Sequence, residues 1–312
     1  MISDLKQQYR QSLKSMDTEE HIDLAFYRPM GFAWAVLFRK LGVTPNAVTI
    51  ASIFLGIGAG ILFYYNTLWI NCISMFLLIW ANTYDSCDGQ LARMTKQYSP
   101  LGRILDGLSG DIWFATIYIA ICLRENHFSP FFAQQPWLIW VIAVTAGICH
   151  GKQAAMADYY RQFHLLFVNG KSELDQASEQ KAFYESLSWK KNFWRKLVQF
   201  FYTKYTINQE AWTPSFQRLR REIARQWPDG NMNPQFVADF RKASLPLMKY
   251  TNILSFNWRT IALFVSLFVG EPWIYFAFEL VVLNGLLIYM MRRHESICRH
   301  FARLINKHHY GE

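Results

Sequence analysis

Six long apolar runs constrain this chain more than any other feature. They cover residues 47–65, 68–84, 104–123, 137–149, 253–270 and 272–291. Several approach the roughly 20 residues that an α-helix needs to cross a bilayer, and they are interrupted mainly where a polar motif intrudes. A length of 312 residues alone would suggest two soluble domains. The apolar runs overrule that interpretation, and we predict an all-α integral membrane protein with six transmembrane helices.

The distribution of basic residues predicts how these helices are oriented. The chain has 32 lysines and arginines and a formal charge of +9, and we place only Arg124 on the outer side. Because lysine and arginine concentrate in cytoplasmic loops, both termini and the polar motif at residues 85–106 should face the cytoplasm. The first 44 residues are too polar for a cleaved signal. We therefore expect a protein of the cell inner membrane or an endomembrane.

The same patterns divide the chain into five consecutive parts. They are an amphipathic interfacial segment (1–44), transmembrane helices 1–4 with the polar motif (45–157), a helical cytoplasmic insert (158–249), transmembrane helices 5–6 (250–292) and a cytoplasmic tail (293–312).

The insert is the unusual part, with 15 Lys/Arg against 9 Asp/Glu. Helix-start signals occur at Ser172, Thr213-Pro214 and Asn233-Pro234, and the basic aromatic segment 189–201 is typical of an interfacial helix. We predict a small helical cap that rests on anionic lipid. Binding of nucleic acid by this basic patch is the less favoured alternative.

The polar motif gathers carboxylates beside an apolar run. Asp85 and Asp88 are three residues apart and therefore share one helix face. Two clustered carboxylates are costly at membrane depth, and oxygen-rich sites of this kind usually hold Mg²⁺, Mn²⁺ or Ca²⁺. Gly89 and Ala92 keep the same face thin, so that a ligand can approach the backbone, and Arg93 adds a positive charge suited to a phosphate.

These residues resemble the CDP-alcohol phosphotransferase (CDP-alcohol phosphatidyltransferase) family, whose pattern is D-x2-D-G-x2-A-R-x8-G-x3-D-x3-D. Seven positions match it, namely Asp85, Asp88, Gly89, Ala92, Arg93, Gly102 and Asp106, and Thr44-Pro45-Asn46 is also similar to that family. The resemblance implies a transferase of phospholipid synthesis, in which a hydroxyl attacks the β-phosphorus of a CDP-linked donor and releases CMP. It also implies Mg²⁺ or Mn²⁺ held by the aspartates, with Gly89, Ala92, Arg93 and Gly102 at the nucleotide.

One position departs from the family pattern. The fourth aspartate, which in the family activates the acceptor hydroxyl and helps to hold metal, is replaced by Gly110, and Asp111 follows it. On a regular helix one extra residue rotates a side chain by about 100°. A π-bulge would return Asp111 to the site, where it would serve as base and metal ligand. His150 and His164 are alternative bases, as is water or a metal-bound hydroxide.

Further basic residues are candidates for binding the phosphate or the acceptor. Lys152, Arg161 and His150 lie at the end of the fourth apolar run, Arg103 follows Gly102, and Arg259 lies near the start of the fifth predicted span. Charged residues at such places face a cavity, pair with one another or extend to headgroups. For Arg259, an ion pair is the alternative to phosphate binding. Glu279 and Asn284 fit polar contacts between helices better than catalysis.

The sequence leaves the substrates open. In one branch of the family the lipid is carried on CDP and a small alcohol such as inositol phosphate, glycerol phosphate or serine accepts it. In the other branch the small alcohol is carried on CDP and diacylglycerol or ceramide accepts it, so a sphingolipid product is one alternative. A second alternative is nucleotide-independent transfer of phosphoinositol from a phospholipid to ceramide. A third is a non-catalytic membrane scaffold on a degenerate fold. The five cysteines show neither disulfide nor zinc spacing. We expect membrane lipids as partners, no nucleic acid, and a homodimer as one possible assembly.

Overall fold

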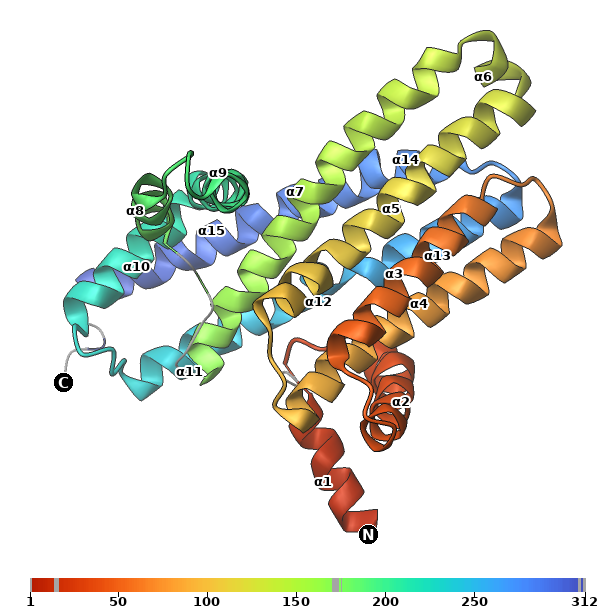
Figure 1. Cartoon of the computed structure of the whole chain (residues 1–312). Coiled ribbons are helices and arrows are strands. Elements are labelled where there is room, and N and C mark those ends of the chain that lie inside the picture. The colour runs from red at the N-terminus through yellow and green to blue at the C-terminus, as the bar shows by residue number, and fades with distance from the viewer. Residues whose placement is uncertain (1, 14–16, 170–173, 175, 308–309, 311–312) are drawn as a thin grey trace. The chain divides into compact units, whose positions relative to one another are not determined.

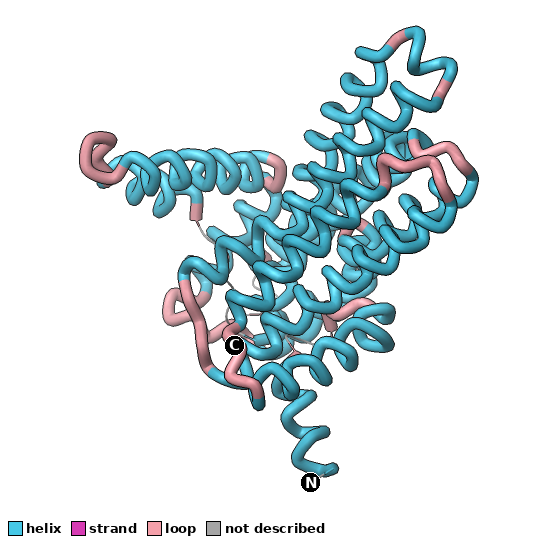
Figure 2. The backbone as a smooth tube through the Cα atoms, turned by 45° about the vertical axis from the view of Figure 1, so that its right-hand side comes forward, coloured by secondary structure: helices cyan, strands magenta, loops and turns pink. Residues whose placement is uncertain are grey.

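The computed structural model describes residues 2–13, 17–169, 174, 176–307 and 310. Every regular element among these residues is a helix, and none of them lies in a strand (Figures 1 and 2). The predicted all-α class is confirmed.

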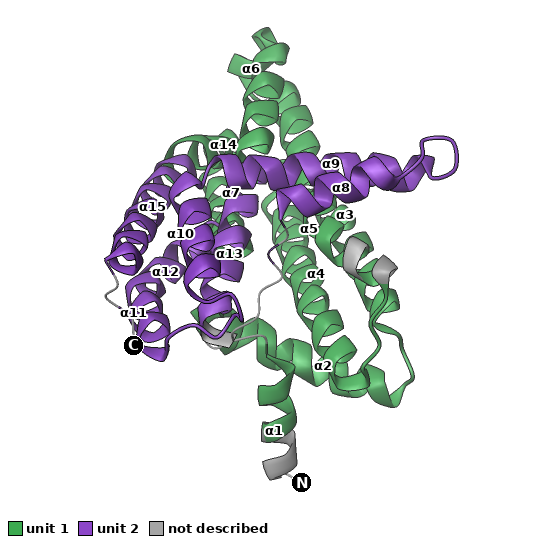
Figure 3. Cartoon of the chain, turned by 90° about the vertical axis from the view of Figure 1, so that its left-hand side faces the viewer, with its two compact units in different colours: residues 1–150, 256–282 green, residues 151–255, 283–312 purple. Residues whose placement is uncertain are grey.

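The chain forms two compact units, shown in different colours in Figure 3. Unit 1 contains residues 1–150 and 256–282, and unit 2 contains residues 151–255 and 283–312. One long helix, α7 (Pro136–Asn169), contributes its first part to unit 1 and the rest to unit 2. The five-part division predicted from the sequence remains a prediction.

Unit 1 holds the polar motif. Its other helices are α1 (Ile2–Ser12), the π-helix η1 (Asp23–Tyr27), α2 (Arg28–Lys40), α3 (Pro45–Leu62), α4 (Leu68–Thr95), α5 (Pro100–Phe128), α6 (Pro130–Gln134), α13 (Phe256–Val269), α14 (Trp273–Ala277) and most of the π-helix η3 (Phe278–Leu283). The α3 helix packs against both α4 and α5 (Figure 1). The motif lies at the end of α4 and the beginning of α5.

Capping residues set where α3 and α5 begin. Thr44 accepts a hydrogen bond from Ala47 N at 3.3 Å, and Ser99 accepts one from Gly102 N at 2.9 Å. A proline follows each cap, in the first helical position, where its missing N–H costs no bond. These caps fix where α3 and α5 begin, and α5 carries the second part of the motif.

Two glycines allow α3 to approach α5 closely. A Cβ at Gly56 would overlap the indole of Trp113, and a Cβ at Gly60 would lie 2.7 Å from Thr116 Cγ2. Trp113 is only 1% exposed and belongs to the main hydrophobic cluster of unit 1, so its ring has no room to move. Small residues one helical turn apart are a common device for close packing of membrane helices.

Replacing Gly56 with alanine should therefore destabilise unit 1. Overpacking a filled core costs about 1–3 kcal/mol, which should lower the unfolding temperature of the purified protein in detergent. Gly58→Ala is the matched control, because no atom lies within 4 Å of a Cβ built there. Equal unfolding temperatures for the two variants would contradict the close packing of α3 on α5.

Five segments of the described chain are long and apolar enough to cross a membrane. They are Pro45–Leu62, Leu105–Phe128, Pro136–Phe167, Pro234–Val269 and Trp273–Asn306. An integral membrane protein is thus supported, but the predicted count of six spans is not confirmed. The predicted run at 68–84 lies in α4, where polar residues such as Asn71, Asn82 and Asp85 reduce the hydropathy of the helix.

Arg124, the basic residue predicted to lie outside, closes the turn between α3 and α4. Its side chain is buried and donates to the carbonyl oxygens of Phe63 and Tyr65 at 3.2 and 3.1 Å. It also donates to Asn71 and Asn66. The charge therefore satisfies the carbonyls that a helix end leaves without partners.

Unit 2 contains the predicted insert. Its helices, besides the second part of α7, are α8 (Ala177–Ser186), α9 (Phe193–Ala211), α10 (Pro214–Gln226), α11 (Pro234–Ser244), the 3₁₀ turn η2 (Leu245–Leu247), α12 (Met248–Ile253) and α15 (Asn284–Asn306). The helix starts predicted at Thr213-Pro214 and Asn233-Pro234 are confirmed. The helix predicted from residue 189 begins at Phe193 and continues beyond 201. Ser172 lies outside the described residues.

Candidate metal and phosphate site

Three aspartates from two helices converge in unit 1. Asp85 and Asp88 project from α4, Asp106 projects from α5, and one ligand oxygen from each lies within 4.8 Å of the others. The structure thus brings together three of the four carboxylates that the sequence suggested for a metal. A cluster of hard oxygen ligands at this separation fits a divalent cation such as Mg²⁺ or Mn²⁺.

Asp88 is the buried member of this cluster. Its side chain is 3% exposed and accepts a hydrogen bond from the hydroxyl of Thr49, on α3. Asp88 lies four residues beyond the apolar run at 68–84 and is therefore outside that predicted span. Burial, followed by the negative charge of Asp85, raises the pKa of Asp88 to about 9. Because a cation between the carboxylates would remove this penalty, the electrostatics of the cluster favour metal binding.

Asp85 is held by a residue that the sequence analysis did not select. Ser109 donates a hydrogen bond to Asp85 Oδ1 at 2.7 Å, and the serine is buried. Ser109 follows Asp106 by three residues and lies on the same face of α5, so helical spacing was a usable signal. For Thr49, no spacing in the sequence indicates its hydrogen bond to Asp88, because Thr49 lies on a third helix, α3.

The Thr49 hydroxyl should matter for function although it is not a metal ligand. Groups that orient a ligating carboxylate typically contribute about 10–100-fold to metal affinity or activity. We expect Thr49→Val to lower metal affinity by that factor, measured by isothermal titration with Mn²⁺. Thr83→Val is the control, since the Thr83 hydroxyl donates only to the Ile79 carbonyl of its own helix. Equal affinities in both variants would contradict the role of Thr49.

The predicted nucleotide residues lie beside the carboxylates. The guanidinium of Arg93 lies close to Gly89, where a Cβ would be 3.4 Å from Arg93 Nη1. Arg93 Nε donates to the carbonyl of Ser12 at 2.6 Å, whereas Nη2 is buried and meets no acceptor among the residues that the structure describes. Ala92 is half-buried in the same turn of α4. A buried donor that lacks a partner is costly, so Arg93 Nη2 is suited to a bound anion.

Gly102 has a packing role at the start of α5. A Cβ at this position would overlap Asn46 Oδ1 and lie 2.9 Å from Ser99 Oγ. Ser99 in turn donates to Asn46 at 3.1 Å. The glycine therefore lets the beginnings of α3 and α5 meet, and its predicted contact with nucleotide remains a prediction.

Asp111 is not part of the carboxylate cluster. Over residues 100–128, whose backbone is described throughout, α5 is a regular α-helix, so the π-bulge that the sequence analysis allowed does not occur there. Asp111 is exposed on α5. Its predicted role as base or metal ligand stays a prediction.

His150 and Arg259 belong to a second polar cluster of unit 1. Arg259 forms a fully buried ion pair with Glu279, which also accepts a hydrogen bond from Tyr275 at 2.6 Å. His150 Nδ1 lies 3.5 Å from Glu279 and 3.2 Å from the hydroxyl of Tyr118. For Arg259 the structure thus shows the ion pair named above as the alternative. A contact with phosphate remains a prediction for both residues.

The remaining basic candidates are placed differently. Lys152 and Arg161 lie in unit 2, where Lys152 is exposed with its ammonium 5.2 Å from the centre of the Trp212 ring. Arg161 donates to Ser255 at 2.9 Å and to Asn252 at 3.3 Å. The side chain of Arg103 is outside the described part of the structure. Phosphate binding by these three residues stays a prediction.

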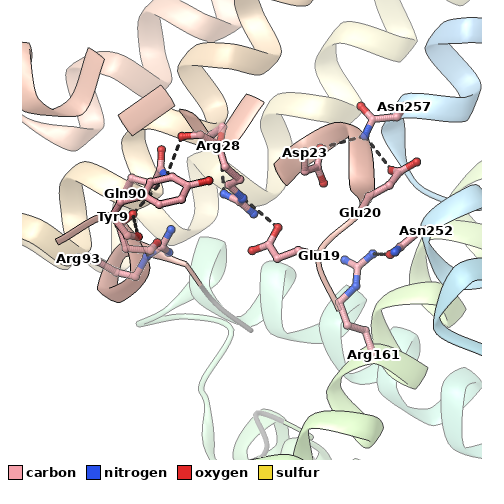
Figure 4. A network of polar contacts seen from close by, with 12 residues as sticks. Tyr9, Glu19, Glu20, Asp23, Arg28, Gln90, Arg93, Arg161, Asn252 and Asn257 are labelled. Atoms are coloured by element: carbon pink, nitrogen blue, oxygen red, sulfur yellow. Dashed lines mark hydrogen bonds and ion pairs between the residues drawn. The ribbon is translucent and has the colours of Figure 1, made fainter. Parts of the chain in front are cut away.

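The N-terminal segment contributes to the surroundings of the motif, which the sequence analysis missed. Arg28 pairs with Glu19 at 2.9 Å, donates to Ser86 Oγ at 3.3 Å, and its carbonyl accepts from Gln90 (Figure 4). Ser86 lies between the two α4 aspartates. The N-terminal segment, which was predicted to be interfacial, therefore contacts the motif helix itself. No spacing rule connects Arg28 to a helix 58 residues away.

The same N-terminal segment also contacts α13 within unit 1. The amide of Asn257 donates to Glu20 at 2.7 Å and to Asp23 at 2.9 Å (Figure 4). Side-chain contacts thus tie residues 19–28 both to the motif helix α4 and to α13.

Comparisons with known proteins agree with this site. Residues 42–163 match the family described as CDP-alcohol phosphatidyltransferase. A CDP-alcohol phosphatidyltransferase class-I family protein of Dictyostelium discoideum is 30% identical over 110 residues, which cover 32% of this chain and 27% of that protein. A CDP-diacylglycerol–glycerol-3-phosphate 3-phosphatidyltransferase of Cereibacter sphaeroides is 30% identical over 96 residues, covering 30% and 40% of the two chains. Residues 42–163 are therefore a domain of this transferase family.

Proposed function

We propose that the chain is a membrane-bound phosphotransferase of lipid synthesis that moves a substituted phosphate from a CDP-linked donor to an alcohol and releases CMP. The observation that carries the proposal is the convergence of Asp85, Asp88 and Asp106 within the stretch that matches the family. Since the matched stretches cover less than half of either relative, the reaction of the whole protein is an inference from this site.

The aspartates fit a divalent metal, Mg²⁺ or Mn²⁺. A bound cation would neutralise negative charge on the pyrophosphate and on the departing CMP. Thr49 and Ser109 hold two of the carboxylates in place through hydrogen bonds, which pre-orients the ligands before substrate arrives. Nη2 of Arg93, which meets no acceptor in the described part of the chain, would offer a hydrogen bond to a donor phosphate, and the absence of a side chain at Gly89 leaves space beside it.

The reaction forms one bond and breaks another at the β-phosphorus. The acceptor oxygen bonds to that phosphorus as the bond to the CMP oxygen breaks, and the hydroxyl proton passes to a base. Asp111 is our first candidate for this base, and His150 is the second. Both lie in unit 1 with the carboxylates.

Lipid analysis tests the proposed function and separates it from the alternatives. Lipids from cells with and without the chain are compared by mass spectrometry, and CMP release by purified protein is measured with CDP-linked donors and Mg²⁺ or Mn²⁺. A new glycerophospholipid or sphingolipid together with CMP release supports the proposal. A ceramide phosphoinositol formed without CMP would indicate nucleotide-independent transfer. Neither product nor CMP would indicate a scaffold and overturn the proposal.

We further propose that the aspartate site and the insert face the cytoplasm. The insert and the connections near the site are rich in lysine and arginine, which concentrate on the cytoplasmic side of membrane proteins. An engineered cysteine at Ser178, which is exposed on α8, should resist a membrane-impermeant thiol reagent in intact cells and react after permeabilisation. A variant without the five native cysteines provides the background. Rapid labelling of intact cells would contradict this orientation.

A further inference from the structure

In unit 2, the α9 helix buries polar side chains, whereas an ordinary surface helix buries apolar ones. Its buried positions are polar, namely Lys196, Thr203, Thr206 and Gln209. The helices α8 and α9 pack side by side as a hairpin. Lys196 donates to the carbonyl of Leu187 and Thr203 to that of Gln180, so both contact the α8 side of this hairpin. Gln209 donates to the carbonyl of Ala155, on α7, at 2.9 Å. The contacts of Lys196 and Thr203 fix which face of the first part of α9 is turned inward, and Gln209 attaches the end of the helix to α7.

The outward face of α9 is apolar and aromatic. Trp194, Val198 and Phe201 are 75%, 59% and 63% exposed. Their spacing of four and three residues places them along one stripe of the helix. A helix in water normally buries its apolar stripe and exposes its polar one. The contacts within unit 2 therefore leave this apolar stripe uncovered.

Basic residues accompany the stripe. Lys190 and Lys191 precede the helix, Arg195 and Lys204 lie on it, and all four are exposed. Residues 190–204 contain no aspartate or glutamate. Tryptophan, tyrosine and apolar residues next to lysine and arginine are the composition of helices that lie in the headgroup region of anionic membranes. Val198 in the middle of the stripe offers no surface for stacking a nucleobase, so the pattern fits lipid better than nucleic acid.

We propose that α9 is an interfacial anchor that inserts its stripe into an anionic lipid surface, with Lys190, Lys191 and Arg195 against the headgroup phosphates. Lys196 supports this arrangement from the inner face, since its ammonium lies 4.7 Å from the centre of the Tyr184 ring and 5.5 Å from that of Trp189. These contacts hold the tip of the hairpin together. The proposal concerns unit 2 alone and does not depend on the transfer reaction.

Fluorescence quenching on the full chain tests this proposal. A polarity-sensitive fluorophore is attached to Val198→Cys in a background without the native cysteines, and the protein is placed in lipid nanodiscs that contain a nitroxide near the headgroup. Ser178→Cys, exposed on α8, is the matched control. Since interfacial helices sink about 5–10 Å into the headgroup boundary, quenching at residue 198 should exceed that at residue 178 by about threefold or more.

The role of charge is tested by changing the lipid and the protein. Quenching at residue 198 should be stronger in discs with about 30% phosphatidylglycerol than in phosphatidylcholine alone, because an anionic surface attracts basic segments. Lys190→Glu with Lys191→Glu should reduce it, whereas Lys181→Glu with Arg225→Glu, two exposed charges elsewhere in unit 2, should not. Circular dichroism and size-exclusion profiles verify that each variant is folded.

Three results would overturn the proposal. The first is equal quenching at residues 198 and 178 in both kinds of disc. The second is a fluorescence change without lipid quenching that coincides with crosslinking between two copies at residue 198, which would assign the stripe to a dimer. The third is a change that occurs only when RNA is added.

Discussion

Asp88→Asn should abolish turnover while leaving the protein folded. The variant keeps the shape of the buried side chain and can still accept from Thr49, but it removes a negative ligand from the cluster of three aspartates. Metal-dependent charge stabilisation contributes several kcal/mol to such reactions, which corresponds to a loss of about 10³-fold or more. The measurement is CMP release by purified protein at saturating Mg²⁺ or Mn²⁺, together with Mn²⁺ affinity.

Asp229→Asn is the matched control for this change. Asp229 is exposed in the loop between α10 and α11, so the same chemical substitution occurs away from the carboxylate cluster. Its turnover and Mn²⁺ affinity should equal those of the wild type. If Asp88→Asn also retained wild-type activity, the assignment of the metal site would be wrong, whatever the product of the reaction.

The sequence could predict that the motif aspartates converge, because this prediction depends on residues that lie close together in the chain. Asp85 and Asp88 are joined by helical spacing alone, whereas Asp106 joined them through the family pattern. The helix starts predicted at Thr213-Pro214 and Asn233-Pro234 depended on the same local kind of signal, since a capping side chain before a proline indicates a helix start. Those two helix starts, each set by residues adjacent in the chain, are confirmed.

Contacts between distant helices could not be predicted in this way. Nothing near Thr49 in the sequence indicates that its hydroxyl meets Asp88, and nothing near Gly56 indicates the Trp113 ring. The partner of Arg259 remained ambiguous for the same reason. Its ion pair with Glu279 joins residues 20 apart, and Glu279 lies in a π-helix that the apolar pattern of the last span does not reveal.

The sequence analysis allowed a π-helical irregularity at a different place. A bulge near Gly110 would have compensated for the shifted aspartate, but α5 is regular there, and the described π-helices are η1 and η3. The structure therefore leaves Asp111 about 100° around the helix from the position of the family's fourth aspartate. Asp111 lies outside the group formed by Asp85, Asp88 and Asp106, so the proton-accepting role proposed for it can be tested apart from metal binding.

Asp111→Asn is the variant that tests this separation. If Asp111 is the general base, the rate of the chemical step should fall by about 10²–10⁴-fold, because that is what positioned proton transfer usually contributes. Mn²⁺ affinity should remain unchanged, since Asp111 is not in the group formed by Asp85, Asp88 and Asp106. Single-turnover CMP release, measured beside Mn²⁺ titration, distinguishes this result from the loss of both properties expected for Asp88→Asn.

His150→Gln provides the comparison that decides between the two candidate bases. His150 contacts Tyr118 and Glu279, so if Asp111 is the base, removing the imidazole should change the rate less than removing the carboxylate. A loss of less than about threefold in Asp111→Asn, set against the 10²-fold expected of a base, would make Asp111 a structural residue. A large loss in His150→Gln under the same conditions would then assign the proton to the histidine, on α7, and leave the metal site as described.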